Sequence, residues 1–245
     1  EIARALAAQA AVALRRGRLI HDRLERLRLE RELEVARIIQ QSSFPAHIPQ
    51  PQGYEIAVWN QPATQTGGDA YDVIPTNDEH RVALLMADAT GHGVGPPQSV
   101  TQLSSMLRMA VRLGAGVSSI AQHANAQLSR DLPPGRFITA WLGEIDGQRH
   151  ELRSLSAGQG PLLLWRSGAR EIESIAVDTV PLGVLDALPA KAGRTIALQQ
   201  GDVFAAISDG VFEARNPSDV MFGVGRVSEA LRGAASTYEA GWRDR

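Results

Sequence analysis

The sequence contains no cysteine among its 245 residues. This absence excludes disulfide bonds, thiolate zinc sites and cysteine nucleophiles, and it fits the reducing conditions of a cytoplasmic location. Long apolar runs are also missing. The longest one, residues 82–87, is far shorter than the roughly 20 residues that cross a bilayer. We therefore expect no membrane contact from this chain.

An excess of one charge sign is absent too, since 25 Lys and Arg face 27 Asp and Glu, for a formal net charge of −2. Nucleic acids and anionic membranes attract proteins with a basic patch, so neither is expected as a partner. Aromatic residues are few, at 5%, while the hydrophobic share of 44% is ordinary for a globular protein. The length accommodates one good-sized domain and an appendage.

Residues 1–43 predict one continuous helix, because they are rich in Ala, Leu, Arg and Glu and contain no proline and a single glycine. Small and apolar residues recur there at alternating steps of four and three, which indicates a coiled-coil seam. The seam positions are Leu6, Ala10, Ala13, Gly17, Ile20, Leu24 and Leu27. The register then slips at Arg31 and Glu34. We predict a homodimer through this helix, and the alternative is an amphipathic helix lying on its own domain.

Beyond a Pro-rich turn, short apolar runs separated by turn residues predict strands over residues 54–60, 82–87, 137–145, 151–156, 162–165, 195–198 and 203–207. Two helices are predicted, one with Val100, Leu103, Leu107 and Ala110 on a single face and one over residues 117–130. Strands grouped apart from helices favour an antiparallel α+β core. We expect Trp59, Trp141 and Trp165 to lie in that core.

Three acidic motifs stand out: residues 67–72 (GGDAYD), 88–93 (DATGHG) and 208–210 (SDG). The last two directly follow apolar runs. A strand fixes the direction of such a carboxylate, and a small residue beside it admits backbone, water or phosphate. Taken singly, each motif is more typical of an ordinary turn than of a metal site. Together, three aspartates without a Cys–His cluster favour Mg²⁺ or Mn²⁺ over zinc.

Several segments resemble, in one collinear order, the SpoIIE/RsbU-type branch of the protein phosphatase 2C-like (PPM) superfamily. They are residues 67–72, 88–93, 135–140 (GRFITA), 156–161 (SAGQGP), 180–183 (VPLG), 208–216 (SDGVFEARN) and 221–223 (MFG). The resemblance implies two stacked antiparallel β-sheets flanked by helices, an α-β-β-α sandwich, preceded here by the long N-terminal helix.

The resemblance also implies two divalent ions, Mn²⁺ or Mg²⁺, held chiefly by aspartates. Asp88 would bridge the ions, the carbonyl of Ala89 would bind one of them and Asp209 the other. Asp69 would be a ligand or a neighbour of the ligands. Asp88 and Asp209 would then act in catalysis through a metal-bound water, which ionises near neutral pH and attacks phosphorus.

The resemblance divides the chain into three parts. Residues 1–18 resemble the end of a GAF-like sensor domain, residues 19–43 form a coiled-coil linker, and residues 44–245 form the phosphatase domain. Gln159 stands where the family commonly has His, and Pro96–Pro97 where it has small residues. Nothing in residues 236–245 resembles the family's final Asp-Asp-x-Thr motif, so we expect the domain to be C-terminally incomplete.

Other polar residues have two interpretations each. His92 is either a general acid or, as the family pattern favours, a residue that shapes the loop between two glycines. His123 and His150 have no companion ligands and are expected at the surface or in a satisfied core. Arg136 and Arg166 are candidate substrate contacts that no motif assigns. The helix that opens at residues 95–97 either offers free amides to a phosphate or caps the fold.

The main functional hypothesis is a metal-dependent serine/threonine protein phosphatase. In this branch the usual substrate is an anti-sigma-factor antagonist of STAS type, in a bacterial partner-switching pathway. The alternative is a catalytically weak or inactive phosphatase-like module that signals by protein binding. A nucleotide-cyclase motif of the GGDEF kind is disfavoured, because Ala70 and Tyr71 do not match it.

Overall fold

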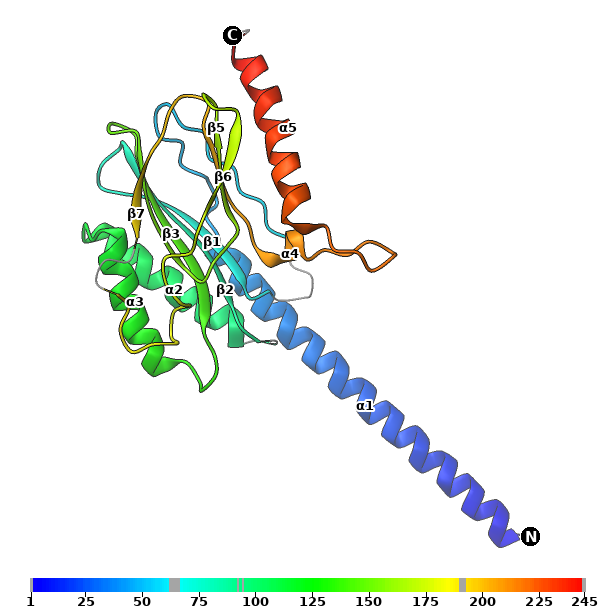
Figure 1. Cartoon of the computed structure of the whole chain (residues 1–245). Helices are drawn as coiled ribbons and strands as arrows, with labels where there is room; N and C mark the ends of the chain where they lie inside the picture. The colour runs from blue at the N-terminus through cyan, green and yellow to red at the C-terminus, as the bar shows by residue number, and fades with distance from the viewer. Residues whose placement is uncertain (1, 62–66, 92, 94, 190–192, 244–245) are drawn as a thin grey trace.

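The computed structural model describes residues 2–61, 67–91, 93, 95–189 and 193–243 (Figure 1). The helices are α1 (Ile2–Ser43), α2 (Gly95–Arg112), α3 (Val117–Asp131), α4 (Asp209–Phe212) and α5 (Gly223–Arg243). The strands are β1 (Asp69–Pro75), β2 (Arg81–Ala89), β3 (Ile138–Asp146), β4 (Glu151–Ala157), β5 (Leu162–Arg166), β6 (Glu171–Ile175), β7 (Arg194–Ala197) and β8 (Val203–Ala206).

The strands form two antiparallel sheets. One has five strands in the order β1-β2-β3-β4-β7, and the other has three in the order β6-β5-β8. The register places Asp69 of β1 opposite Asp88 of β2, and Asp88 opposite Thr139 of β3. The motifs around these three residues, which lie far apart in sequence, therefore meet at one end of the larger sheet.

Two apolar layers hold the molecule together. Helices α2 and α3 pack on one face of the five-stranded sheet, and the second layer lies between the two sheets. Helix α5 contacts β5 and β6 and buries Val227 and Ala235, so it covers the outer face of the smaller sheet (Figure 1). The expected α-β-β-α sandwich is confirmed.

Alternation along β1 and β2 decides which face each side chain reaches. In β2, Leu85 and Ala87 belong to the layer under the helices, whereas Leu84 and Met86 belong to the layer between the sheets. Asp88 has the parity of Met86 and therefore points to the side of the second sheet.

Helix α1 extends away from the sandwich, as Figure 1 shows. Its seam residues Ile20, Leu24 and Leu27 are 51%, 60% and 46% exposed, so over this stretch the helix does not lie on its own domain. The side chains of Leu6, Ala10 and Ala13 lie outside the described residues. Among the helices that the structure describes, none has the length and apolarity needed to cross a bilayer.

The strand predicted over residues 54–60 is wrong. The side chain of Gln50 donates to the carbonyl of Ile56 at 2.8 Å and accepts from its N–H at 2.7 Å, which occupies groups that a strand ladder would use. Trp59 is 74% exposed, which contradicts its placement in the core, whereas Trp141 and Trp165 are buried as expected. Because residues 54–60 do not join a sheet, the indole of Trp59 has no sheet face to pack on.

The other predicted strands and both predicted helices are present, and the ends of the predicted ranges differ from the observed ends by two residues at most. The sequence pattern missed β1, β6, α4 and α5. Strand β1 carries two aspartates and ends on Pro75, which are unfavourable for a strand. Strand β6 is largely exposed and lacks a clear apolar face.

Candidate metal centre

Asp69 and Asp88, two of the three aspartates predicted as metal ligands, lie opposite one another on neighbouring strands. Both are half-buried, and both have the side-chain parity of the layer between the sheets. The end of that layer therefore holds two carboxylates next to each other. Like charges directly opposite on a sheet are destabilising unless a cation lies nearby.

Gly68 leaves room beside these groups. A Cβ atom at residue 68 would lie 2.6 Å from the carbonyl oxygen of Ala89 and 2.6 Å from Oδ1 of Asp88. The two predicted oxygen donors thus converge on the space that this glycine keeps open. Carboxylate and carbonyl oxygens that point to a common space are the donor set a hard divalent cation prefers, so the residues present fit such an ion.

Asp209 reaches the same region from the three-stranded sheet. It begins α4 just after β8, and the hydroxyl of the preceding Ser208 donates to Oδ2 of Asp69 at 3.2 Å. The pKa of Asp88 is raised to about 6, chiefly by burial and then by the charges of Asp69 and Asp209. Burial also raises the pKa of Asp69, against the hydrogen bond from Ser208, and Asp209 adds to the rise. The three carboxylates therefore interact electrostatically.

The electrostatic interaction of the three carboxylates does not by itself make them a complete set of metal ligands. Over the part of the chain that the structure describes, no three His, Cys, Asp or Glu side chains are gathered closely enough to hold a metal ion together. Asp209 is exposed at the start of α4, while Asp69 and Asp88 are half-buried. The assignment of Asp69, Asp88, Ala89 and Asp209 as ligands stays a prediction.

The loop after Asp88 is fastened to the start of β3. The amide and hydroxyl of Thr90 both donate to the carbonyl of Phe137 at 3.1 Å, and the amide of Phe137 donates back to that hydroxyl. Arg136 donates to the carbonyl of Thr90 at 3.0 Å, and a Cβ at Gly91 would collide with its guanidinium. Arg136 thus supports the loop, whereas His92 lies outside the described residues.

The remaining candidates have structural partners. Arg166 bonds the carbonyl of Ala197 and forms an ion pair with Asp202, so it joins the end of β5 to the end of β7 and to the turn that follows. His150 contacts the hydroxyl of Tyr54 at 3.1 Å, and His150 and His123 are both exposed, as expected.

Sequence reasoning missed Gln40, whose side chain is buried near the end of α1. It donates to the carbonyl of Gly67 at 2.8 Å and approaches that of Asp69 at 3.4 Å. The aromatic ring of Phe44 stacks on that of Tyr71, with the ring centroids 4.8 Å apart. A lone glutamine in an amphipathic helix carries no signal of this contact. The end of the linker helix nevertheless touches the motif that carries Asp69.

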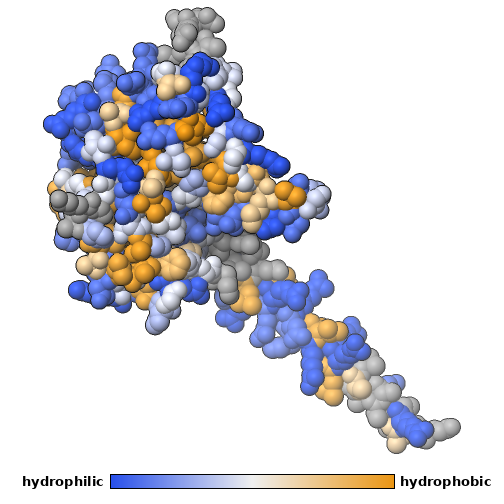
Figure 2. Space-filling view, in the orientation of Figure 1, coloured by the Kyte–Doolittle hydropathy of each residue, from blue (hydrophilic) through white to orange (hydrophobic). Residues whose placement is uncertain are grey.

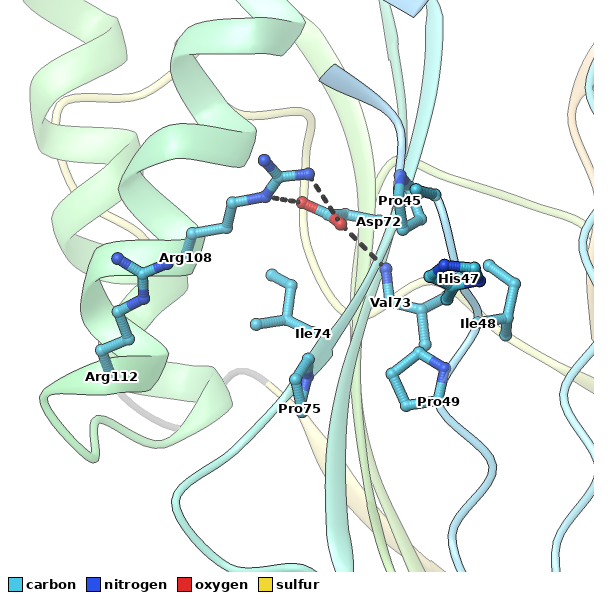
Figure 3. A pocket seen from close by; sticks show the side chains of 11 residues that line it. Pro45, His47, Ile48, Pro49, Asp72, Val73, Ile74, Pro75, Arg108 and Arg112 are labelled. Atoms are coloured by element: carbon cyan, nitrogen blue, oxygen red, sulfur yellow. Dashed lines mark hydrogen bonds and ion pairs between the residues drawn. The ribbon is translucent and has the colours of Figure 1, made fainter. Parts of the chain in front are cut away.

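Asp72, the second aspartate of the same motif, lies on the opposite face of β1. It is buried and accepts from Ser104 and from Arg108, each at 2.6 Å, and Arg108 also bonds the carbonyl of Ser43. Figure 3 shows this pair at the wall of a cleft of about 520 Å³ between residues 45–49, β1 and the end of α2. Neither Asp69 nor Asp88 is among the residues that line this cleft.

A family model described as Stage II sporulation protein E (SpoIIE) matches residues 78–241. Phosphoserine phosphatase RsbU of Bacillus subtilis (strain 168) is 22% identical over 193 residues, covering 79% of this chain and 57% of RsbU. Phosphoserine phosphatase RsbP of the same organism is 24% identical over 192 residues, covering 77% of this chain and 47% of RsbP. The chain thus spans only about half the length of these curated relatives.

Among solved structures, the SiaA-PP2C domain of Pseudomonas aeruginosa aligns with a TM-score of 0.68 and 20% identity, covering 86% of this chain and 83% of that domain. At this identity the likeness establishes the fold, a PP2C-type sandwich. The matched family model spans more than half of the chain and includes the motifs around Asp88 and Asp209. The chain belongs to the SpoIIE family.

Proposed function

We propose that this chain is a metal-dependent serine/threonine protein phosphatase that uses Mn²⁺ or Mg²⁺. The observation that carries the proposal is the convergence of Oδ1 of Asp88 and the carbonyl of Ala89 on the space beside Gly68, with Asp69 opposite. Membership of the SpoIIE family and the phosphatase names of the relatives RsbU and RsbP support the same reaction.

Each residue of the site has a stated role in this proposal. Asp88 would contribute to holding both ions, the carbonyl of Ala89 would hold one of them and Asp209 the other, and Asp69 would bind directly or orient Asp88. Bound divalent ions would acidify water for attack on phosphorus and offset the charge of the phosphoryl oxygens. Ser208 keeps the carboxylate of Asp69 in place through its hydrogen bond. No side-chain nucleophile is needed, which agrees with the absence of cysteine.

The proposed substrate is a phosphoserine or phosphothreonine in a protein, with an anti-sigma-factor antagonist of STAS type as the specific candidate. Two relatives are named phosphoserine phosphatases, and the solved structures similar to this chain include one titled as the RsbU and RsbW domains of Rv1364c from Mycobacterium tuberculosis. A role in bacterial partner switching would require a cytoplasmic location. The partner-switching role and the cytoplasmic location are both parts of this proposal.

The proposed assembly is a homodimer through α1. Its exposed seam at Ile20, Leu24 and Leu27 would be covered by the same residues of a second copy. Gln40 and Phe44, at the end of α1, contact the strand of Asp69, so a change in the pairing of the helices would reach the site.

A second candidate function is a phosphatase-like module that binds partners with little or no turnover. It is favoured by one observation: no three metal-binding side chains are gathered together within the described residues. Turnover distinguishes the two candidates. The active-enzyme proposal requires release of phosphate from p-nitrophenyl phosphate and from a phosphoserine peptide that depends on Mn²⁺ and stops with a chelator. Full-length chain that binds a phosphoprotein without releasing phosphate at any Mn²⁺ concentration would favour the binding module.

A further inference from the structure

Gln159 is a buried polar side chain that the proposed reaction does not use. Only 4% of its surface is exposed. It lies in the connection between β4 of the five-stranded sheet and β5 of the three-stranded sheet, where the chain crosses from one sheet to the other. The hydroxyl of Ser156 donates to its backbone carbonyl and holds the loop. The backbone of Gln159 is therefore fixed independently of the contacts that its side-chain amide makes.

The two ends of the Gln159 amide contact the two sheets. Oε1 accepts from the hydroxyl of Thr139 at 2.7 Å, and Nε2 donates to the carbonyl of Ile207 at 3.5 Å. Thr139 is the register partner of Asp88, and its hydroxyl also lies 3.4 Å from the carbonyl of Asp88. The amide thus touches the strand next to one predicted ligand and the residue just before Ser208.

Ile207 is held on both of its backbone groups by this one loop. Its amide donates to the carbonyl of Pro161 at 3.3 Å, and its carbonyl accepts from Gln159. The chain then continues through Ser208, which bonds Asp69, to Asp209. Contacts that begin at Gln159 therefore reach the neighbourhood of all three aspartates.

We infer that Gln159 is a positioning residue that ties the strands of Asp69 and Asp88 to the segment of Asp209 and so sets the spacing of the three carboxylates. This inference rests on the proposed metal-dependent function. Three carboxylates near one another repel, and without a cross-link the segment after β8 would relax away from the larger sheet. An amide suits the task because one planar group carries both an acceptor and a donor at fixed separation.

The test compares Gln159→Met, which keeps length but removes both hydrogen bonds, with Thr139→Val, which removes only the partner hydroxyl. Asn125→Leu is the matched control: Asn125 is also a buried amide, but it bonds Gly183 and Leu185 instead of the site segments. The first readout is Mn²⁺ affinity by calorimetry of the full chain. We expect both test variants to bind roughly tenfold more weakly, as for other residues that orient metal ligands, and the control to bind like wild type.

The second readout needs neither metal nor turnover. Hydrogen exchange of the metal-free chain should be at least about tenfold faster over residues 203–212 in Gln159→Met, and unchanged there in Asn125→Leu. If the wild-type chain binds no Mn²⁺, the proposed function fails, while the exchange result still decides whether Gln159 holds this segment. Unchanged exchange and unchanged Mn²⁺ affinity in both test variants would overturn the inference. If Gln159→Met does not fold, Thr139→Val alone decides it.

Discussion

Asp88 is the residue on which most of the proposed chemistry depends. It lies opposite Asp69, its Oδ1 faces the space beside Gly68, and its pKa is raised by burial and by both neighbouring aspartates. In the metal-free protein the ionised form of such a carboxylate is destabilised, whereas a bound cation would stabilise it.

Replacing Asp88 or Asp209 with Asn keeps the shape of the side chain and removes a charge that the cations need. We expect each variant to lose at least about 100-fold in Mn²⁺-dependent phosphatase rate, with unchanged circular dichroism. The rates on p-nitrophenyl phosphate measure the effect. Near-normal activity in both variants would contradict the two-metal assignment.

The raised pKa of Asp88 also has a consequence for stability. Because the folded-state pKa of about 6 exceeds the ordinary 3.8, the folded protein binds the proton more tightly than the unfolded chain does. Stability of the metal-free protein should therefore fall as pH rises from about 4 to about 6, with the full penalty present above that range. Asp88→Asn removes this penalty. With a chelator at pH 7.5 the variant should be more stable by roughly 1 kcal/mol, a figure reduced for the half-exposed position.

Thermal unfolding checks this at two pH values. The difference between the variant and wild type should shrink toward pH 4 and reverse at pH 7.5 when Mn²⁺ stabilises only the wild type. A wild-type protein that is the more stable of the two in chelator at pH 7.5 would show that Asp88 is not strained by its neighbours.

At the scale of elements, α1 connects an exposed apolar seam to the strand that carries Asp69. Its exposed seam lies along the projecting helix, which Figure 2 shows with apolar side chains at the surface between polar ones, and its end contacts β1 through Gln40 and Phe44. A long helix with exposed leucines gains stability mainly by packing against a partner.

Replacing Leu24 and Leu27 with Glu tests the proposed dimer, because it would bury four charges at a paired seam. We expect light scattering to report a monomer for this variant and a dimer for wild type. Replacing Arg28 and Glu32 with Ala is a suitable control, since these residues pair with each other at the surface of the same helix. A variant that stays dimeric would place the interface elsewhere.

At the scale of the molecule, the site lies where the two sheets meet at one end of the sandwich. Asp69 and Asp88 come from the larger sheet and Asp209 follows the smaller one, so the relative position of the sheets determines whether the carboxylates act together. The outer helices stabilise each sheet separately. The hydrogen bonds of Gln159, which link the two sheets, would help to set this relative position.

The metal stoichiometry follows from the same arrangement. Two divalent ions repel, and the three aspartates supply few negative charges to hold both. We expect calorimetric titration with Mn²⁺ to find at most one tight site in this chain, with little turnover except at high Mn²⁺. Two tight sites per chain would show that its own ligand set is sufficient.

Much of this could be predicted from the sequence, because the signals are local. Apolar periodicity indicated α1, α2, α3 and most strands, and carboxylates directly after apolar runs indicated Asp88 and Asp209. Where local signals were mixed, as in β1 and in residues 54–60, the predictions were incomplete or wrong. Secondary structure at such places depends on whether a partner strand is available, which local propensity does not contain.

The sequence by itself determined the absence of a thiol and the collinear order of SpoIIE-like motifs, and from these it predicted oxygen ligands. Only the tertiary structure decided which carboxylates meet. Strand register placed Asp69 opposite Asp88, and the period of two turned Asp72 of the same motif toward Arg108 on the other face. Side-chain contacts between distant segments, such as those of Gln40 and Gln159, were likewise decided by packing, because hydrogen bonds between distant residues leave no periodic trace in a sequence.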